Sequence, residues 1–197
     1  MCRFIETIKI VNGLAFNFEL HNERMNATRN DFFCECKKIN LDDHVKCPDD
    51  LSGTVKCRVI YSKEVEEVDY AEYKPKIINK LKLVDADYID YRYKYEDRSV
   101  LTALYDKKMD CDDVLIVKNG LVTDTSYSNI AFFDGKGWTT PRNPLLKGVK
   151  RHKLISEGIL SEDDIRADDL KKFVKATLIN AMLDPGEIEL PIHNIIL

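Results

Sequence analysis

Three Asn-Gly or Asp-Gly pairs stand between runs of β-favouring residues, and this arrangement constrains the fold more than any other feature of the sequence. Asn12-Gly13 separates FIETIKI from LAFNF, and both turn residues tolerate the positive φ that a two-residue hairpin needs. Asn119-Gly120 and Asp134-Gly135 divide the run VLIVKNGLVTDTSYSNIAFFDGKGW in the same way. Antiparallel strands are therefore predicted near the start of the chain and again beyond its midpoint.

Helical and extended segments are expected around these hairpins. Apolar spacing predicts helices at residues 19–33, 97–109, 148–157 and 167–174. Further strands are expected in TVKCRVIYS, EVEEVDYAEY and INKLKLVD, whereas KATLINAML is compatible with either a strand or a helix. The pattern changes near residues 84–88. We therefore expect an α+β fold with a small N-terminal domain, residues 1–84, and a larger C-terminal domain, residues 85–197.

Composition narrows the class of protein. The chain has 197 residues, a formal net charge of -4 and scattered rather than clustered cations, so a nucleic-acid partner is not indicated. The opening MCRFIETIKI lacks the features of a secretion signal and no apolar run is long enough to cross a membrane, so a cytoplasmic location is expected. The six cysteines are interpreted as free thiols. A zinc site is a weaker alternative, because the spacing of its candidate ligands is unusual: Cys34, Cys36, His44 and Cys47.

One lysine stands in an unusual context, in the run YRYKYEDR at residues 91–98. Period-two alternation predicts a strand with tyrosines on one face and charged side chains, including Lys94, on the other. A solvated cationic strand face explains this pattern. A nucleophilic amine at Lys94 is the alternative, and support for it has to come from elsewhere in the chain.

Five stretches of the sequence stand in an order that resembles the class IV aminotransferase family. They are FIETIKIVNG, LHNERMNATR, YKYEDR, DVLIVKNGLVTDTSYSNIAFF and TTPRNPLLKGVKRHKLI. This family includes branched-chain and D-amino-acid aminotransferases and aminodeoxychorismate lyase. The resemblance implies the two-domain fold of D-amino-acid aminotransferase (fold type IV), pyridoxal 5'-phosphate as cofactor, and a homodimer acting on a small amino-acid-like substrate.

The resemblance implies a role for Lys94 and Arg24. Lys94 occupies the place of the family lysine that binds the cofactor covalently, as a displaceable amine. Arg24, in HNER, is similar to the arginine of the family's His-x-x-Arg, which binds the cofactor phosphate. Without this context, Arg24 would be interpreted as a solvated helix charge.

Other residues match family positions around the cofactor ring and phosphate. Asp124 stands where the family usually has a glutamate facing the pyridine nitrogen, and a turn-stabilising aspartate is the alternative. Asn129 matches an asparagine that follows this acid. LLKGVKR is similar to the family's Gly-Ile-Thr-Arg turn, so Val149 and Lys150 would offer backbone amides to the phosphate at a helix start. Asn180 and Ala181, in LINAML, show a weaker resemblance, to a second phosphate contact late in the chain.

The reaction itself is less constrained by the sequence. The segment after Lys94 is similar to the lyase's Lys-x-x-Asn-Arg, and Thr7 falls near a threonine associated with lyase proton transfer. Both favour elimination of pyruvate to give 4-aminobenzoate, although Thr7 also belongs to the family's common Phe-Glu-Thr opening. A small amino-acid aminotransferase is the first alternative, and a non-catalytic binding protein is the second. Arg58 is a candidate for a substrate carboxylate, although an outward-facing strand arginine fits equally. The chain begins almost at the Phe-Glu-Thr segment, so a reduced substrate site is also expected.

Overall fold

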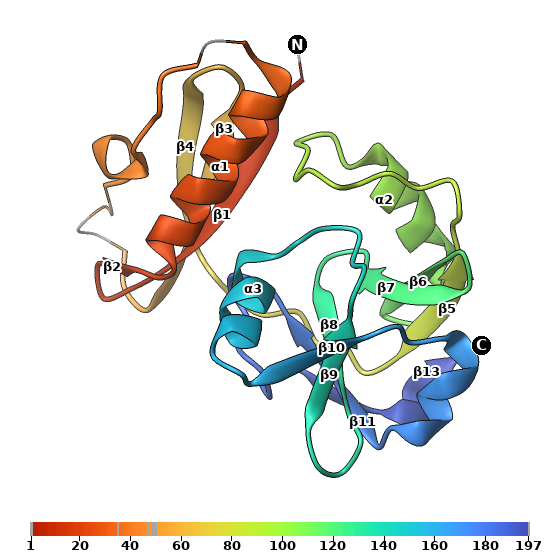
Figure 1. The fold of residues 1–197 in the computed structure, drawn as a ribbon. Helices are drawn as coiled ribbons and strands as arrows, with labels where there is room; N and C mark the ends of the chain where they lie inside the picture. The colour runs from red at the N-terminus through yellow and green to blue at the C-terminus, as the bar shows by residue number, and fades with distance from the viewer. Residues whose placement is uncertain (1, 35, 47, 49–50, 197) are drawn as a thin grey trace. The chain divides into compact units, whose positions relative to one another are not determined.

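The computed structural model describes residues 2–34, 36–46, 48 and 51–196. The chain divides into two compact units, whose elements are labelled in Figure 1. The first unit comprises Met1–Lys74 with Tyr93–Asp97, and the second comprises Pro75–Arg92 with Arg98–Leu197. The segment Tyr93–Asp97 therefore belongs to the first unit, although the chain on both sides of it belongs to the second.

An antiparallel sheet forms the centre of the first unit. Its strand order is β2-β1-β3-β4. Asn12 and Gly13 have φ angles of 51° and 78°, and Val11 pairs with Leu14 across them. The predicted Asn-Gly hairpin is therefore confirmed, because both turn residues adopt the positive φ that this turn requires. The four strands are β1 (Phe4–Val11), β2 (Leu14–Ala15), β3 (Thr54–Tyr61) and β4 (Val65–Glu72).

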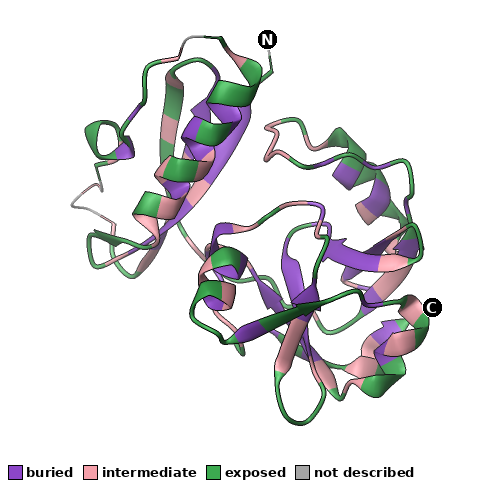
Figure 2. Cartoon of the chain, in the orientation of Figure 1, coloured by how far each residue is buried: buried purple, intermediate pink, exposed green. Residues whose placement is uncertain are grey.

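One helix, α1 (Phe18–Phe32), lies along a face of this sheet (Figure 1). Its residues toward the sheet are buried, whereas the outer side is exposed (Figure 2). Phe4 of β1 is fully buried, and its ring centroid lies 4.7 Å from that of Phe32 and 5.2 Å from that of Tyr95. A short 3₁₀ turn, Leu41–Asp43, contributes the buried Leu41 to the same core.

The prediction of a strand at residues 91–98 is wrong. The segment forms no regular strand and makes only an isolated bridge, between Tyr95 and Phe4. Tyr91 is buried in the second unit, whereas Tyr93 and Tyr95 pack against Phe4 in the first. A segment that passes from one unit to the other and back has no room for a continuous ladder, and this explains why the alternating pattern did not produce a strand.

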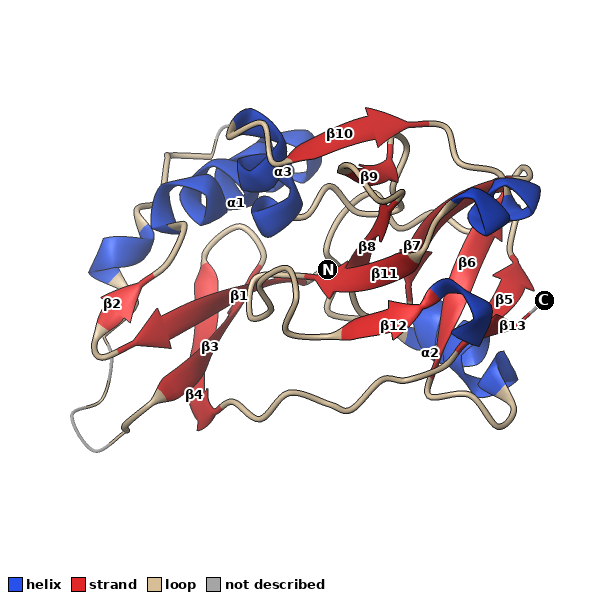
Figure 3. Cartoon of the chain, turned by 90° about the horizontal axis from the view of Figure 1, so that it is seen from below, coloured by secondary structure: helices blue, strands red, loops and turns tan. Residues whose placement is uncertain are grey.

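Two sheets form the second unit (Figure 3). One has the order β10-β9-β8-β11-β12 and the other has the order β13-β5-β6-β7. The pairs β5–β6, β5–β13 and β9–β10 are parallel, and the others are antiparallel. The strands are β5 (Leu81–Asp85), β6 (Asp113–Lys118), β7 (Leu121–Thr125), β8 (Asn129–Phe133), β9 (Trp138–Pro141), β10 (Leu160–Asp163), β11 (Lys175–Ile179), β12 (Glu189–Pro191) and β13 (Ile195–Ile196).

The two hairpins predicted from Asn-Gly and Asp-Gly turns in this unit are also confirmed. Lys118 pairs with Leu121 across Asn119-Gly120, and Phe133 pairs with Trp138 across the turn that contains Asp134-Gly135. The helices are α2 (Ser99–Tyr105) and α3 (Val149–Ser156), and further 3₁₀ turns span Asp106–Lys108, Ala167–Lys172 and Ile192–Asn194.

Three expectations for the second unit need correction or completion. The helix expected at 167–174 is the 3₁₀ segment Ala167–Lys172, because Val174 already donates its N–H to Phe133 and leads into β11. KATLINAML begins with strand β11, which pairs with β8. The division between the units falls at Lys74/Pro75 rather than near residue 84, since β5 pairs with β6 and so belongs to the second unit.

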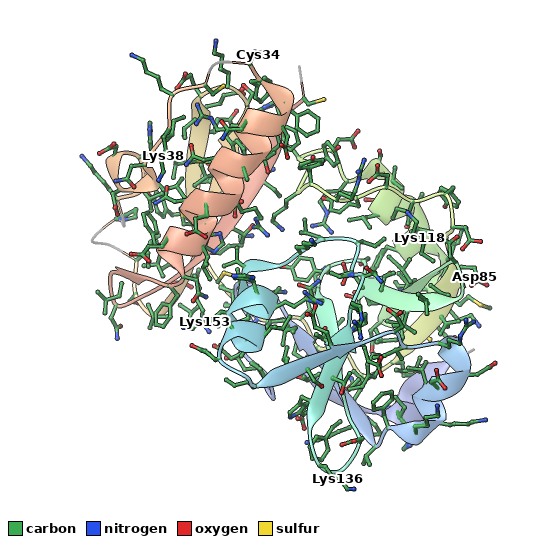
Figure 4. All side chains as sticks on the ribbon, in the orientation of Figure 1. Cys34, Lys38, Asp85, Lys118, Lys136 and Lys153 are labelled. Atoms are coloured by element: carbon green, nitrogen blue, oxygen red, sulfur yellow. The ribbon has the colours of Figure 1, made fainter. Side chains whose placement is uncertain are left out.

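Metal-ligating side chains do not cluster in the described part of the chain. Cys34 follows the end of α1 and is exposed (Figure 4), and Cys36 is partly buried, each as a free thiol. Cys47 of the zinc alternative lies outside the described residues. Among the described residues, no helix is long and apolar enough to cross a membrane.

Phe4→Ala should lower the free energy of unfolding by about 3–5 kcal/mol, because it removes the ring that joins β1, α1 and the Tyr93–Asp97 segment. Urea denaturation followed by circular dichroism measures this change. Phe16→Ala is the matched control, since Phe16 is exposed, and it should cost less than about 1 kcal/mol. Similar losses for the two variants would contradict this account of the core.

Candidate active site

A buried carboxylate lies at the junction of β7 and β8. Asp124 is at the end of β7 and Asn129 begins β8, and the turn between them is closed by a 2.9 Å hydrogen bond from Thr125 N to Ser128 O. Asn129 Nδ2 donates to Asp124 Oδ1 at 2.8 Å and to the carbonyl oxygen of Leu146 at 2.8 Å. The backbone N–H of Leu146 donates to Asp124 Oδ2 at 2.9 Å. The turn that joins β7 to β8 and the loop before α3 therefore share one polar network.

Ionisation of Asp124 is unfavourable at this buried position. Burial raises the pKa of Asp124 to about 6, although hydrogen bonds from Leu146 and Asn129 and the positive charge of Arg151 act in the opposite direction. A carboxylate can accept about four hydrogen bonds. Each oxygen of Asp124 accepts one from the residues named above, so the group is able to accept another from a cationic ligand.

Gly148 brings the start of α3 close to this network. A Cβ atom at residue 148 would lie 2.0 Å from Asn129 Oδ1, so only glycine allows this approach. The first intrahelical bond of α3 runs from His152 N to Gly148 O. The amides of Val149 and Lys150 belong to the first turn, where a helix has no internal acceptors and its dipole favours an anion.

The side chains of the first turn of α3 are engaged elsewhere. Lys150 is buried and its Nζ contacts the carboxylate of Asp184. Arg151 Nη2 donates to Pro141 O at 2.7 Å and to Glu162 Oε1 at 2.5 Å. The side chain of Lys150 is therefore engaged by Asp184, and the role of its backbone N–H toward an anion stays a prediction.

Asn180 has a structural task in this unit. Its Oδ1 accepts hydrogen bonds from the backbone of Met182 at 2.8 Å and Leu183 at 3.1 Å, and its Nδ2 donates to Ser128 Oγ at 2.9 Å. Asn180 thus closes the turn after β11, which contains Ala181, and joins it to the turn between Asp124 and Asn129.

A second buried carboxylate, Glu6, lies in the first unit, between β1 and α1. Arg24 Nε donates to Glu6 Oε1 at 2.8 Å, and Arg24 Nη2 donates to Glu6 Oε2 at 2.5 Å. The Nδ1 atom of His21 lies 2.6 Å from Glu6 Oε2. Glu6 and His21 are fully buried, whereas the side chain of Arg24 is 17% exposed. The candidate phosphate ligand is therefore held by a carboxylate through two parallel hydrogen bonds.

Interactions among Glu6, Arg24 and His21 shift the pKa values of Glu6 and His21. Burial alone would raise the pKa of Glu6, but Arg24 and His21 outweigh it and lower this pKa to about 2. Burial lowers the pKa of His21 more than Glu6 raises it, and the charges of Arg24 and Lys94 lower it further. Lys94 is in the same unit, where its carbonyl oxygen accepts a 2.9 Å hydrogen bond from Ile5 N.

Thr7 and Arg58 form a separate pair. They lie directly opposite each other on β1 and β3, and because side chains alternate along a strand, they share the sheet face opposite to that of Glu6. Arg58 Nη2 lies 3.4 Å from Glu96 Oε1. The structure therefore places Thr7 beside Arg58 on one face of the sheet. Glu6, which binds Arg24, lies on the opposite face.

Sequence reasoning missed several members of these networks. Glu6 and His21 escaped attention, although a carboxylate at an inward position of β1, in phase with Phe4 and Ile8, is a signal that a buried partner exists. Leu146 acts through its backbone, for which the sequence carries no signal.

Comparison with known proteins identifies the family. The sequence model of amino-transferase class IV matches residues 48–188. An uncharacterized protein of Haemophilus influenzae is 37% identical over 185 residues, which are 92% of this chain and 98% of that protein. The chain belongs to the class IV aminotransferase family.

Solved structures agree with this assignment and show the type IV fold of these enzymes. A protein of Haemophilus somnus, provisionally named 4-amino-4-deoxychorismate lyase, superposes with a TM-score of 0.85 at 30% identity, over 92% of this chain and 97% of that one. A hypothetical aminotransferase of Mycobacterium tuberculosis, solved with bound pyridoxal phosphate, has a TM-score of 0.71 at 17% identity, over 94% and 80% of the two chains. The expected family and fold are confirmed.

Gly148→Ala should displace Asn129 and so break its hydrogen bonds with Asp124 and Leu146. We expect a loss of about 1–3 kcal/mol in the free energy of unfolding, since buried polar groups lose their partners. Gly137→Ala is the control, because a Cβ at residue 137 meets nothing within 4 Å, and it should change stability by less than about 0.5 kcal/mol. Thermal and urea unfolding measure both effects, and equal stabilities would refute the close approach.

Asp124→Asn should reveal the raised pKa of Asp124 as a pH-dependent stability. The folded-state pKa of about 6 lies above the ordinary value of 3.8, so protonated Asp124 stabilises the fold below pH 3.8 and this contribution is lost as the pH rises through 6. The stability of the variant relative to the wild type should therefore increase between these pH values and level off above them. Urea titrations at a series of pH values measure this, and a flat difference would show that folding leaves the pKa of Asp124 unshifted.

Proposed function

We propose that this chain is a pyridoxal-phosphate-dependent enzyme that eliminates pyruvate from aminodeoxychorismate to leave 4-aminobenzoate. The observation that carries the proposal is the buried carboxylate of Asp124, fixed by Asn129 and Leu146 beside the start of α3. A desolvated carboxylate next to an anion-favouring helix start suits a ligand with a protonated ring nitrogen and a phosphate.

Each unit contains residues that the resemblance assigns to this cofactor. Asp124 would hold the proton on the pyridine nitrogen, and the positive ring would in turn stabilise the ionised carboxylate. The amides of Val149 and Lys150 would donate to the phosphate. Arg24 would add its guanidinium to the phosphate contacts while remaining paired with Glu6. Asn129 would keep Asp124 oriented.

Lys94 is the proposed catalytic residue. Its amine would hold the cofactor covalently and, once released by the substrate amine, would take the proton from the substrate's α carbon. Bound pyridoxal phosphate supplies an electron sink that stabilises the resulting carbanion. Thr7 would assist proton transfer and Arg58, opposite it on β3, would bind a substrate carboxylate, both from the sheet face opposite to that of Glu6. Asn180 and Ala181 would add a second phosphate contact from the turn that Asn180 closes.

Support for the lyase reaction comes from the Haemophilus somnus relative, whose provisional name carries this activity and whose sequence is 30% identical. The segment from Lys94 to Arg98 supports the same choice through its similarity to the lyase pattern. An amino-acid aminotransferase of the same family is the alternative, because the two reactions share the early steps and the same cofactor ligands.

We also propose that the protein is a homodimer, as is typical of the family. Analytical sedimentation would measure this oligomeric state.

Lys94→Ala should abolish covalent attachment of the cofactor. Incubation of the wild type with pyridoxal phosphate should give a yellow protein, and borohydride should trap the label on the peptide that contains Lys94, as mapped by mass spectrometry. Lys153→Ala, on α3, is the control and should be labelled like the wild type. A label that persists at the same site in Lys94→Ala would overturn the assignment of the lysine.

The reaction is tested with the same pair of variants. The wild type and Lys153→Ala should release pyruvate from aminodeoxychorismate, and Lys94→Ala should lose this activity by several orders of magnitude. Exchange of amino groups with a keto acid, in place of pyruvate release, would favour the aminotransferase. A wild type that binds no cofactor would leave the non-catalytic alternative.

A further inference from the structure

The buried carboxylate of Glu6 accepts three hydrogen bonds, more than an ion pair with Arg24 alone would require. Two of the bonds come from the edge of the Arg24 guanidinium that carries Nε and Nη2, and the third comes from His21. A guanidinium held at one edge by a carboxylate has a fixed plane and a fixed opposite edge. The position of Glu6 on β1 therefore determines the direction in which Arg24 can meet an anion.

His21 shows how tightly this arrangement is specified. A carboxylate only accepts hydrogen bonds, so the proton of the imidazole must be on Nδ1, facing Glu6. In the neutral ring, Nε2 then carries a lone pair, and this buried atom has no hydrogen-bond partner among the described residues. Nε2 can accept a hydrogen bond from a water or an amine. A phosphate dianion cannot bind to it, so an anion has to be met by Arg24.

The net charge of the group supports the same conclusion. Glu6 is ionised, since its pKa is about 2, and its charge cancels that of Arg24, while burial keeps the pKa of His21 low. Tyr61 of β3 adds no charge, because burial raises its pKa above the usual range. Because the charges of Glu6 and Arg24 cancel, this pair alone attracts an anion only weakly, and the geometry of the Arg24 hydrogen bonds sets the direction of binding.

We propose that Glu6 is a positioning residue that fixes the guanidinium of Arg24 for the cofactor phosphate and holds His21 as a neutral acceptor that does not bind this phosphate. This inference rests on the proposed function for the identity of the anion. The arrangement of Glu6, His21 and Arg24 itself is a property of the protein without cofactor. Glu6 is not a catalytic residue in this account, since it acts through Arg24.

The test compares pyridoxal phosphate with pyridoxal, which lacks the phosphate. In Glu6→Gln, one amide oxygen faces three donors, so Arg24 loses part of its fixed geometry. Affinity for pyridoxal phosphate, measured by absorbance titration, should fall by roughly tenfold to a hundredfold, and affinity for pyridoxal should change by less than about twofold. An equal loss for both ligands, or no loss for either, would overturn the positioning role.

Asn26→Ala is the matched control in the same helix. Asn26 is buried and holds Arg29 and the backbone of Ile39, without a hydrogen bond to Glu6 or Arg24. This variant should lose stability but keep the ratio of the two affinities. In an Arg24→Lys background, Glu6→Gln should cause no further change in that ratio, because the residue through which Glu6 acts is already altered. An additional loss would show that Glu6 acts by another route.

A separate measurement on the wild type without cofactor keeps this inference distinct from the proposed function. Long-range ¹⁵N–¹H spectra of the imidazole should show a protonated Nδ1 and an unprotonated Nε2 for His21 at neutral pH. A proton on Nε2 would overturn the arrangement whether or not the protein binds pyridoxal phosphate. If the tautomer is as expected but the wild type binds no cofactor, the proposed function fails and the arrangement of Glu6 stands.

Discussion

Burial of carboxylate oxygens is the constraint on which both units depend. Glu6 in β1 and Asp124 in β7 are removed from water, and each is surrounded by donors from a different element. An unpaired buried charge would cost several kcal/mol, so these donors must arrive with the fold. Glu6 thereby ties α1 to its sheet, and Asp124 ties the loop before α3 to the turn between β7 and β8.

The two carboxylates carry different kinds of partner, and their proton affinities diverge for that reason. Glu6 faces a guanidinium, which overcomes the cost of burial and keeps it ionised, with a pKa of about 2. Asp124 accepts hydrogen bonds from the side-chain amide of Asn129 and the backbone of Leu146, and its pKa is raised to about 6. The charge of Glu6 is thus compensated within the protein. The charge of Asp124 is the one that a cationic ligand would stabilise.

Local chemistry explains which parts of this fold the sequence predicted. The hairpins at Asn12-Gly13 and Asn119-Gly120 were correct because positive φ is a property of the turn residues themselves. The strand expected at 91–98 was wrong, since the segment Tyr93–Asp97 belongs to a different unit from its neighbours in the chain. Alternation describes which side chains are apolar, and a change of packing partner within the segment leaves no trace in that pattern.

The sequence indicated the candidate residues whose side chains belong to short motifs. It did not indicate residues that contribute through their backbone or through their packing in the fold. Lys94, Arg24 and Asp124 followed from short motifs. Glu6 and Leu146 did not, because their importance comes from what folding brings beside them.

Asp124 illustrates how such packing bears on function. Its side chain is one methylene shorter than the glutamate usual in the family, and in this chain it is anchored to the backbone of Leu146, in the loop that leads to Gly148. The close approach of Gly148 to Asn129 fixes the start of α3 against the same network. A shift of the loop would therefore move the carboxylate and the amides of Val149 and Lys150 together. One loop therefore sets the distance between Asp124, the proposed partner of the ring nitrogen, and the amides of Val149 and Lys150, the proposed partners of the phosphate. A shift of this loop could compensate for the shorter side chain of Asp124, because it would move the carboxylate and the amides together.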